Sequence, residues 1–284
     1  MGQKKIAPFY LLITALLWCF NGVLTKYIPW SAFTTAVIRG TTTFVCISLV
    51  RRCKIWKIRL NRYKFLCSLC YLLQGLLFFL ALKNTTAANA TVLQNTSPLY
   101  IMLLNAMLLK KYPKKQDILA CVALLIGVSI TFAGSLETGG TLGNCLALIG
   151  ALFYAGVFFL SKMPQVDHPI EPVLLGNGYY MLLLPLCFLD PNLPNHEPSV
   201  WLAQLALGLF CGGAAWLCFD KGIRHTSALT ANFITMIEPV GSAVLTFLLL
   251  NERPTVVSLV GCSIVLITLV FYNIRQAKDT SEES

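Results

Sequence analysis

Residues 85–113 read TTAANATVLQNTSPLYIMLLNAMLLKKYP, and residues 226–254 read TSALTANFITMIEPVGSAVLTFLLLNERP. A constant offset of 141 aligns matching residues of the two stretches: Thr85 with Thr226, Ala87 with Ala228, Ala90 with Ala231, Pro98 with Pro239, Leu108 with Leu249 and Pro113 with Pro254. An offset of 136 aligns a second segment, including Ala15 with Ala151, Trp18 with Tyr154 and Lys26 with Lys162. The chain therefore contains two related halves, an organisation typical of secondary transporters.

The composition is that of a membrane protein. The chain has 284 residues, of which 56% are hydrophobic and 12% are charged, and its mean hydropathy is +0.70. Soluble domains carry about 25% charged residues. Apolar runs of about twenty residues, the length that crosses a bilayer core of about 30 Å, follow one another along almost the whole sequence. We therefore expect an all-α integral membrane protein that is surrounded by the lipid bilayer.

Hydropathy predicts ten transmembrane helices joined by short connections. The expected spans are 7–28, 33–50, 63–82, 86–109, 115–134, 142–162, 170–189, 199–219, 226–250 and 255–274. Prolines and glycines in the connections are typical turn residues. The spans group into two five-helix repeats, at 7–134 and 142–274, and a short polar tail follows at 275–284.

The distribution of basic residues predicts the orientation. With both termini in the cytoplasm, 18 of the 22 Lys and Arg residues lie on the cytoplasmic side, and only Lys26, Lys83 and Arg253 lie outside. This bias is the one that membrane insertion favours. Each copy holds five spans, an odd number, so the second copy crosses the membrane upside down relative to the first. The chain is thus predicted to be an inverted repeat with a binding site near the bilayer midplane.

Glu238 is the principal candidate for a binding residue. It lies near the middle of the span 226–250, and it shares one helical face with Ala231, Thr235 and Ser242. A carboxylate at that depth is costly unless it faces a cavity or a polar partner. It could neutralise a cationic group of a substrate, carry a coupling proton, or pair with another buried polar group.

The matching helix of the first half has amides instead of an acid, because Ser97 occupies the position of Glu238. Gln94 and Asn95 could hydrogen-bond to a solute, and hydrogen bonding between helices is an equally open role for them. Pro98 and Pro239 predict kinks in the middle of their spans, since proline cannot donate a backbone hydrogen bond. The kinks could expose carbonyls to a ligand or serve only to shape the bundle.

Arg39 and several aromatic side chains complete the candidate site. Arg39 lies inside the second predicted span and could form a structural pair or attract an anionic group of a substrate. Trp18 and Tyr154 occupy equivalent positions in the two repeats, so they are expected at equivalent depths. Together with Trp216 they could stack on a substrate or surround a cation, although aromatic side chains in membrane proteins also serve in packing.

Other classes of protein fit the sequence less well. The net charge of +10 arises from short loops between spans and predicts orientation rather than nucleic-acid binding. The CxxC of Cys67 and Cys70 has no partner pair, whereas a structural zinc site needs four ligands, so we expect no metal and no cofactor. An integral-membrane enzyme or a channel with a central polar cavity is the alternative function.

These features resemble the drug/metabolite transporter superfamily, and within it the EamA-type ten-span transporters. The resemblance covers essentially the whole chain and rests on the ten short-looped spans in two halves and on Arg39 in the sequence VIRG. Each half also has an Ala/Thr-rich helix start, a mid-helix Pro and a closing acid soon followed by Pro. In the second repeat these positions are Ala231, Pro239, Glu252 and Pro254, with Glu238 in the typical sequence IEPV. The first repeat departs from the pattern at Lys111, where an acid is usual.

The resemblance implies two EamA domains that move a small organic solute by alternating access, through a cavity lined by the first, third, fourth, sixth, eighth and ninth helices. Family members handle amino acids, purines, sugars, choline and drugs, and here an amino acid, an amine or a similar solute is expected. A proton or cation could be coupled to transport. The chain would act as a monomer or homodimer, and its expected location is the bacterial cytoplasmic membrane. The expected substrate-binding residues are Glu238, Gln94, Asn95, Trp18, Tyr154, Trp216 and Thr235, and the expected structural or gating residues are Pro98, Pro239 and Arg39.

Overall fold

A computed structural model describes residues 2–52, 58–110, 113–136, 140–193, 197–235, 237–251 and 255–282. All of the regular secondary structure in these ranges is helical. The closing-acid position Glu252, its neighbour Pro254 and the corresponding Lys111 lie outside the described residues.

The helices of the first half form five consecutive rods. They are α1 (Gly2–Trp18) continued by α2 (Phe20–Tyr27), α3 (Ala32–Arg51), α4 (Arg62–Asn84), α5 (Ala87–Gln94) continued by α6 (Ser97–Leu109), and α7 (Lys115–Leu136).

The second half repeats this order. Its rods are α8 (Thr141–Leu160), α9 (Ile170–Leu182) continued by the 3₁₀ segment η2 (Leu184–Leu189), α10 (Pro198–Ala206) continued by the π-helix η3 (Leu207–Ala214) and α11 (Ala215–Ile223), α12 (Ala228–Thr235) with α13 (Ile237–Leu250), and α14 (Val256–Glu282).

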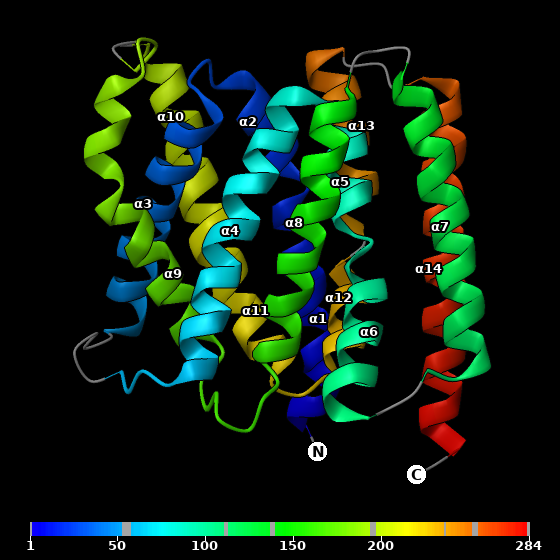
Figure 1. The fold of residues 1–284 in the computed structure, drawn as a ribbon. Coiled ribbons are helices and arrows are strands. Elements are labelled where there is room, and N and C mark those ends of the chain that lie inside the picture. Colours follow the sequence, from blue (N-terminus) through cyan, green and yellow to red (C-terminus); the bar gives the residue numbers. More distant parts are fainter. Residues whose placement is uncertain are drawn as a thin grey trace.

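The rods run alternately up and down, so the two halves have opposite orientations. Helix α1 begins and α14 ends at the same end of the bundle, which we call the terminal end, and the opposite end is called the far end (Figure 1). The first half starts at the terminal end with α1, whereas the second half starts at the far end with α8 (Figure 1). The predicted all-α class and its inverted five-helix halves are therefore confirmed.

Length and composition agree with a membrane location. Within the described residues, six helices are long and apolar enough to cross a membrane, and two shorter apolar helices accompany them. Many large apolar side chains are exposed on the outside of the bundle, among them Phe188, Leu189 and Leu182, each at least 76% exposed. Such an apolar surface suits contact with lipid rather than water.

Short polar side chains cap the helices where the sequence turns back. Ser31 accepts a hydrogen bond from the Thr34 backbone N–H at the start of α3, Asn61 does the same for Lys64 at the start of α4, and Thr86 for Asn89 at the start of α5. Each cap satisfies a backbone donor that the helix itself leaves without an acceptor.

The prolines of the fourth and ninth rods both lie in the first turn of a helix. The fourth rod breaks at Asn95 and Thr96, and Pro98 lies in the first turn of α6. In the ninth rod, Pro239 lies in the first turn of α13, just after the described part of α12 ends at Thr235. A proline is tolerated in a first turn because the N–H that it lacks has no acceptor there.

Small residues allow helices of the two halves to pack closely. The sequence has a ladder of Gly143, Ala147, Ala151 and Ala155 along α8, which packs against α4. A Cβ atom built on Gly143 would lie 2.7 Å from the Asn84 carbonyl carbon and 2.8 Å from its oxygen. The backbone of Asn84 cannot easily move away, so this position requires glycine.

We predict that Gly143→Ala lowers the stability of the protein, by about 1–3 kcal/mol, because the new methyl group overlaps the Asn84 backbone. Gly150→Ala on the same helix is the matched control, since its nearest neighbour, the Leu77 Cβ atom, would lie 3.4 Å away. Thermal unfolding of the detergent-solubilised variants measures the difference. Equal melting temperatures for the two variants would contradict this account of the α4–α8 contact.

Candidate functional site

A small internal cavity lies where the two repeats meet. Its lining residues are Trp18, Asn21, Arg39, Gln74, Gly75, Phe78, Phe79 and Gln94 from the first repeat, and Tyr154, Trp216 and Glu238 from the second. Its volume is about 20 Å³. A cavity needs about 10–15 Å³ of this kind of space to hold one water molecule, so it has little room for anything larger.

Glu238 contributes the carboxylate of the cavity from the first turn of α13, and its residue surface is 5% exposed. The N-terminal turn of a helix is a favourable place for an anion, because its backbone N–H groups carry partial positive charge. The Asn21 amide is close enough to hydrogen-bond with the carboxyl, and Arg39 attracts it electrostatically. The carboxylate is thus supported by a helix end, an amide and a distant cation.

Arg39 is held in the cavity by a backbone carbonyl and an aromatic ring. Neither of these partners carries a negative charge. Its Nη2 atom donates a hydrogen bond of 3.1 Å to the Cys211 carbonyl, and its guanidinium lies 5.4 Å from the centroid of the Phe79 ring. No carboxylate of the described residues lies within 4.0 Å of it, and its Nε atom has no hydrogen-bond partner there. Arg39 therefore faces Glu238 across the site without forming a direct ion pair.

Two backbone carbonyls of the π-helix η3 accept hydrogen bonds from side chains of the first repeat. The Cys211 carbonyl accepts hydrogen bonds from Trp18 Nε1 at 3.1 Å and from Arg39. One turn earlier, the Gly208 carbonyl accepts a 3.0 Å hydrogen bond from Thr43 Oγ1. All three donors belong to the first repeat, so this segment of the second repeat is a place where the halves are joined. Short π-helical segments are frequent at functional sites.

Aromatic rings of both repeats stack around the cavity. The centroids of Trp18 and Trp216 are 5.1 Å apart, and those of Trp18 and Tyr154 are 6.1 Å apart. Tyr71 meets Trp216 edge-on at 4.9 Å. The structure therefore brings the symmetry-related Trp18 and Tyr154 into one cluster. Trp18 comes from the first repeat and Tyr154 from the second, so the cluster lies between the repeats.

Several polar atoms of the cavity have no hydrogen-bond partner among the described residues. They are Asn21 Oδ1, Gln94 Oε1, Trp216 Nε1 and Arg39 Nε. Buried polar groups are normally paired, so such a group in a native structure needs an explanation. Four of them around one cavity indicate a site that is completed by water or by a ligand.

The structure brings most of the predicted site residues together. Glu238, Gln94, Trp18, Tyr154, Trp216 and Arg39 all line the cavity. Asn95 and Thr235 are buried beside it rather than on its lining, because the Asn95 amide donates to the Thr91 carbonyl at 2.8 Å and Thr235 hydrogen-bonds with Tyr154. Pro98 lies in the first turn of α6, and Pro239 lies in the first turn of α13.

Five lining residues have no counterpart in the sequence prediction: Asn21, Gln74, Gly75, Phe78 and Phe79. The amides carried a usable signal, because each is an isolated polar residue within an apolar span. The two phenylalanines could not be distinguished from packing residues. In the described parts of the chain, no three His, Cys, Asp or Glu side chains gather closely enough to hold a metal ion.

An all-helical bundle with a duplicated, inverted membrane fold and a polar cavity between its halves defines the class of multi-pass membrane transporters. The chain belongs to the EamA-like transporter family, whose model matches it twice, at residues 5–133 and 141–274. It is thereby a member of the drug/metabolite transporter superfamily.

Curated relatives are transporters of similar length. The chain is 24% identical over 299 residues to the uncharacterized transporter YwfM of Bacillus subtilis, covering 99% of this chain and 98% of that protein. It is 24% identical over 291 residues to the uncharacterized inner membrane transporter YicL of Salmonella typhimurium, covering 96% and 97%. A crystal structure of a protein that is 19% identical shares the fold, with a TM-score of 0.70 and coverage of 96% of this chain and 98% of that one.

We predict that Trp18→Phe destabilises the protein by about 1 kcal/mol more than Trp216→Phe. Both changes shrink a ring of the same cluster, but only Trp18 donates to a carbonyl, that of Cys211, whereas the Trp216 Nε1 has no partner among the described residues. Thermal or denaturant unfolding of the two variants measures the difference. Equal destabilisation would show that the Trp18–Cys211 hydrogen bond contributes nothing.

Proposed function

We propose that the protein is a secondary transporter that moves a small organic metabolite, an amino acid, an amine or a similar solute, by alternating access through the cavity between its two repeats. The observation that carries this proposal is the composition of that cavity. One carboxylate, one guanidinium, amides and aromatic rings from both halves converge on it. A site shared by both halves changes its exposure when the halves rock against each other.

The size of the cavity supports a conformation that is closed around the site. Pockets for organic ligands usually measure about 300 Å³ or more, whereas this cavity measures about 20 Å³. A solute would therefore enter only after helices move apart. The break of the fourth rod next to Pro98 and the π-helix η3 are places where the backbone could bend with little loss of hydrogen bonding.

The chemistry of the cavity supports a solute with a positively charged group. Glu238 would attract an amino group, and the rings of Trp18, Tyr154 and Trp216 favour a cation or an apolar side chain. Arg39 would attract a carboxylate if the solute carries one. Glu238 could also exchange a proton or bind a cation that is coupled to transport. The solute would then compete with the coupling ion for one carboxylate.

A channel or an integral-membrane enzyme would use the same cavity differently. A catalytic centre for hydrolysis or acyl transfer needs paired carboxylates or a nucleophile with a base. The lining has a single carboxylate and no histidine, serine or cysteine side chain. A channel would need a continuous opening, which the 20 Å³ cavity does not offer. These comparisons favour a carrier, and its assembly would be a monomer or a homodimer.

We place the protein in the cytoplasmic membrane of a bacterium with both termini in the cytoplasm. Helices α1 and α14 begin and end at the same end of the bundle (Figure 1). That end carries most of the Lys and Arg residues of the sequence, which favours the cytoplasmic side.

We predict that Glu238→Gln abolishes transport, or removes its dependence on pH, while the protein still folds and inserts. Glutamine keeps the size and hydrogen-bonding groups of the side chain but removes the charge that would attract an amino group or a proton. A thermal-shift screen against metabolite classes first identifies the solute, because a ligand of the folded state raises the melting temperature. Uptake of that solute into proteoliposomes is then compared for the wild type and the variant.

Glu197→Gln is the control, because Glu197 is exposed just before α10 and lies outside the cavity lining. Its transport should equal that of the wild type. Unchanged transport and unchanged pH dependence in Glu238→Gln would contradict a role of this carboxylate in binding or coupling.

A further inference from the structure

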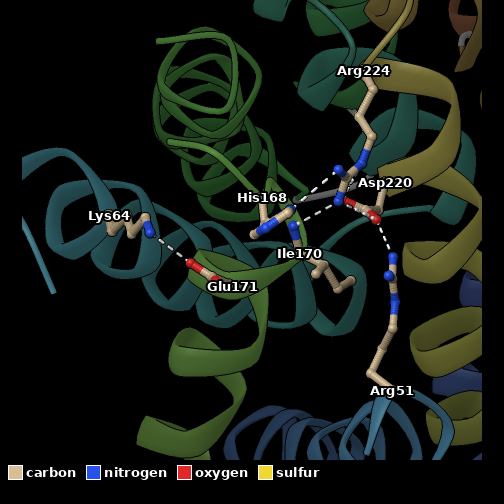
Figure 2. A network of polar contacts seen from close by, with 7 residues as sticks. All are labelled: Arg51, Lys64, His168, Ile170, Glu171, Asp220 and Arg224. Carbon is tan, nitrogen blue, oxygen red and sulfur yellow. Dashed lines mark hydrogen bonds and ion pairs between the residues drawn. The ribbon is translucent and has the colours of Figure 1, made fainter. Parts of the chain in front are cut away.

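The terminal end of the bundle is closed by a buried carboxylate that ties the two repeats together. Asp220 in α11 is 1% exposed, and it is paired with Arg51 at the end of α3 in the first repeat (Figure 2). It also accepts hydrogen bonds from the Ile170 backbone N–H at 3.1 Å and from Arg224 at 2.9 and 3.0 Å (Figure 2). The carboxylate thus has partners on α3, at the start of α9 and directly after its own helix.

A second ion pair joins the repeats at the same end. Lys64 at the start of α4 donates to Glu171 in the first turn of α9 at 2.6 Å (Figure 2). Its side chain is 4% exposed, so the pair is shielded from water on the lysine side. Opening of this end requires α3 and α4 to separate from α9 and α11, and both ion pairs would then break.

The far end is closed by a related arrangement around Asp190, directly after η2. Its carboxylate accepts a 2.8 Å hydrogen bond from the Ser31 backbone N–H, at the start of α3 in the first repeat. Lys83 at the end of α4 donates to the Ile28 carbonyl, and its charge is repelled by Lys26 and attracted by Asp190. Burial would raise the pKa of the Asp190 carboxyl, but hydrogen bonds from Thr34 and Ser31 hold it below the ordinary value, so this acid is ionised at neutral pH.

We propose that two buried carboxylates hold the gates of the transporter shut, one at each end of the central cavity: Asp220, paired with Arg51, at the terminal end, and Asp190, which accepts from the Ser31 backbone N–H, at the far end. This inference rests on the proposed alternating-access function. Opening one end breaks the contacts of one carboxylate while those of the other stay intact, so the solute never meets an open path. Among the described residues, Asp220 has basic side chains within 4.0 Å, and Asp190 has none. The terminal gate is therefore the more firmly closed of the two.

The test measures how easily each end opens and needs no knowledge of the solute. Cys19 and Cys211 are buried beside the cavity, 4% and 1% exposed, and serve as native reporters. A membrane-impermeant maleimide is applied to one side of sealed vesicles, and mass spectrometry of peptides gives the labelling rate at each cysteine. Asp220→Asn should raise labelling of the reporters about tenfold from the side of the termini only. Asp190→Asn should raise it from the opposite side only.

Asp167→Asn is the matched control at the terminal end. Its side chain is 72% exposed and reaches Lys64 only at 3.7 Å, so labelling should not change. Arg51→Gln breaks the pair between repeats while Asp220 keeps Arg224 and Ile170, and it replaces Asp220→Asn if that variant fails to fold. It too should raise labelling from the side of the termini.

Two outcomes would overturn the gates. One is a variant that melts at a lower temperature but shows no increase in labelling while folded, which would assign the pairs a purely structural role. The other is an equal increase from both sides for either variant. Failure of the proposed transport function is recognised separately, because proteoliposomes with the wild-type protein would then take up no solute, whatever the labelling shows.

Discussion

A backbone carbonyl at the centre of a membrane must find a donor within the protein, because the hydrocarbon offers no water. The π-helix η3 (Leu207–Ala214) exposes such a carbonyl at Cys211, and the first repeat supplies two donors, Trp18 and Arg39. The rest of the site depends on this contact. It sets the position of the Trp18 ring in the aromatic cluster, and it holds the guanidinium near Glu238 without an ion pair.

The same constraint explains why the cavity is poised for a ligand. Glu238, Arg39 and the amides are buried, and several of their polar atoms have no partner among the described residues. Each such group costs free energy that only water or a bound solute can recover. Close packing elsewhere compensates for this cost, as where Gly143 touches the Asn84 backbone. The protein therefore combines a tightly packed interface between its repeats with an incompletely satisfied centre, a distribution expected where binding has to change the structure.

The fold could be predicted from the sequence because its main constraints are local. The second span, expected at 33–50, is α3 at Ala32–Arg51, and the sixth, expected at 142–162, is α8 at Thr141–Leu160. The π-helix was not predicted, and its Cys211 carbonyl contacts Trp18 and Arg39, which are distant in sequence. In the candidate site, charge and repeat symmetry pointed to Glu238 and to the Trp18–Tyr154 pair. Phe78 and Phe79 could not be recognised, because an aromatic residue on the cavity and one facing a neighbouring helix look alike in sequence.

An inverted repeat places the same backbone at both ends of the molecule, so it gives the two end-open states similar free energies. The differences between the copies must then decide which state is preferred. At the centre, Glu238 stands where the first repeat has Ser97, so the charge that meets the solute comes from one half alone. At the ends, Asp220 has basic side chains within 4.0 Å, whereas Asp190 has none among the described residues. A difference of about 1.4 kcal/mol between the two gates changes the ratio of the two states tenfold, and one broken ion pair can supply that much. The symmetry of the fold therefore makes the movement accessible, and a few residues that break the symmetry set its direction.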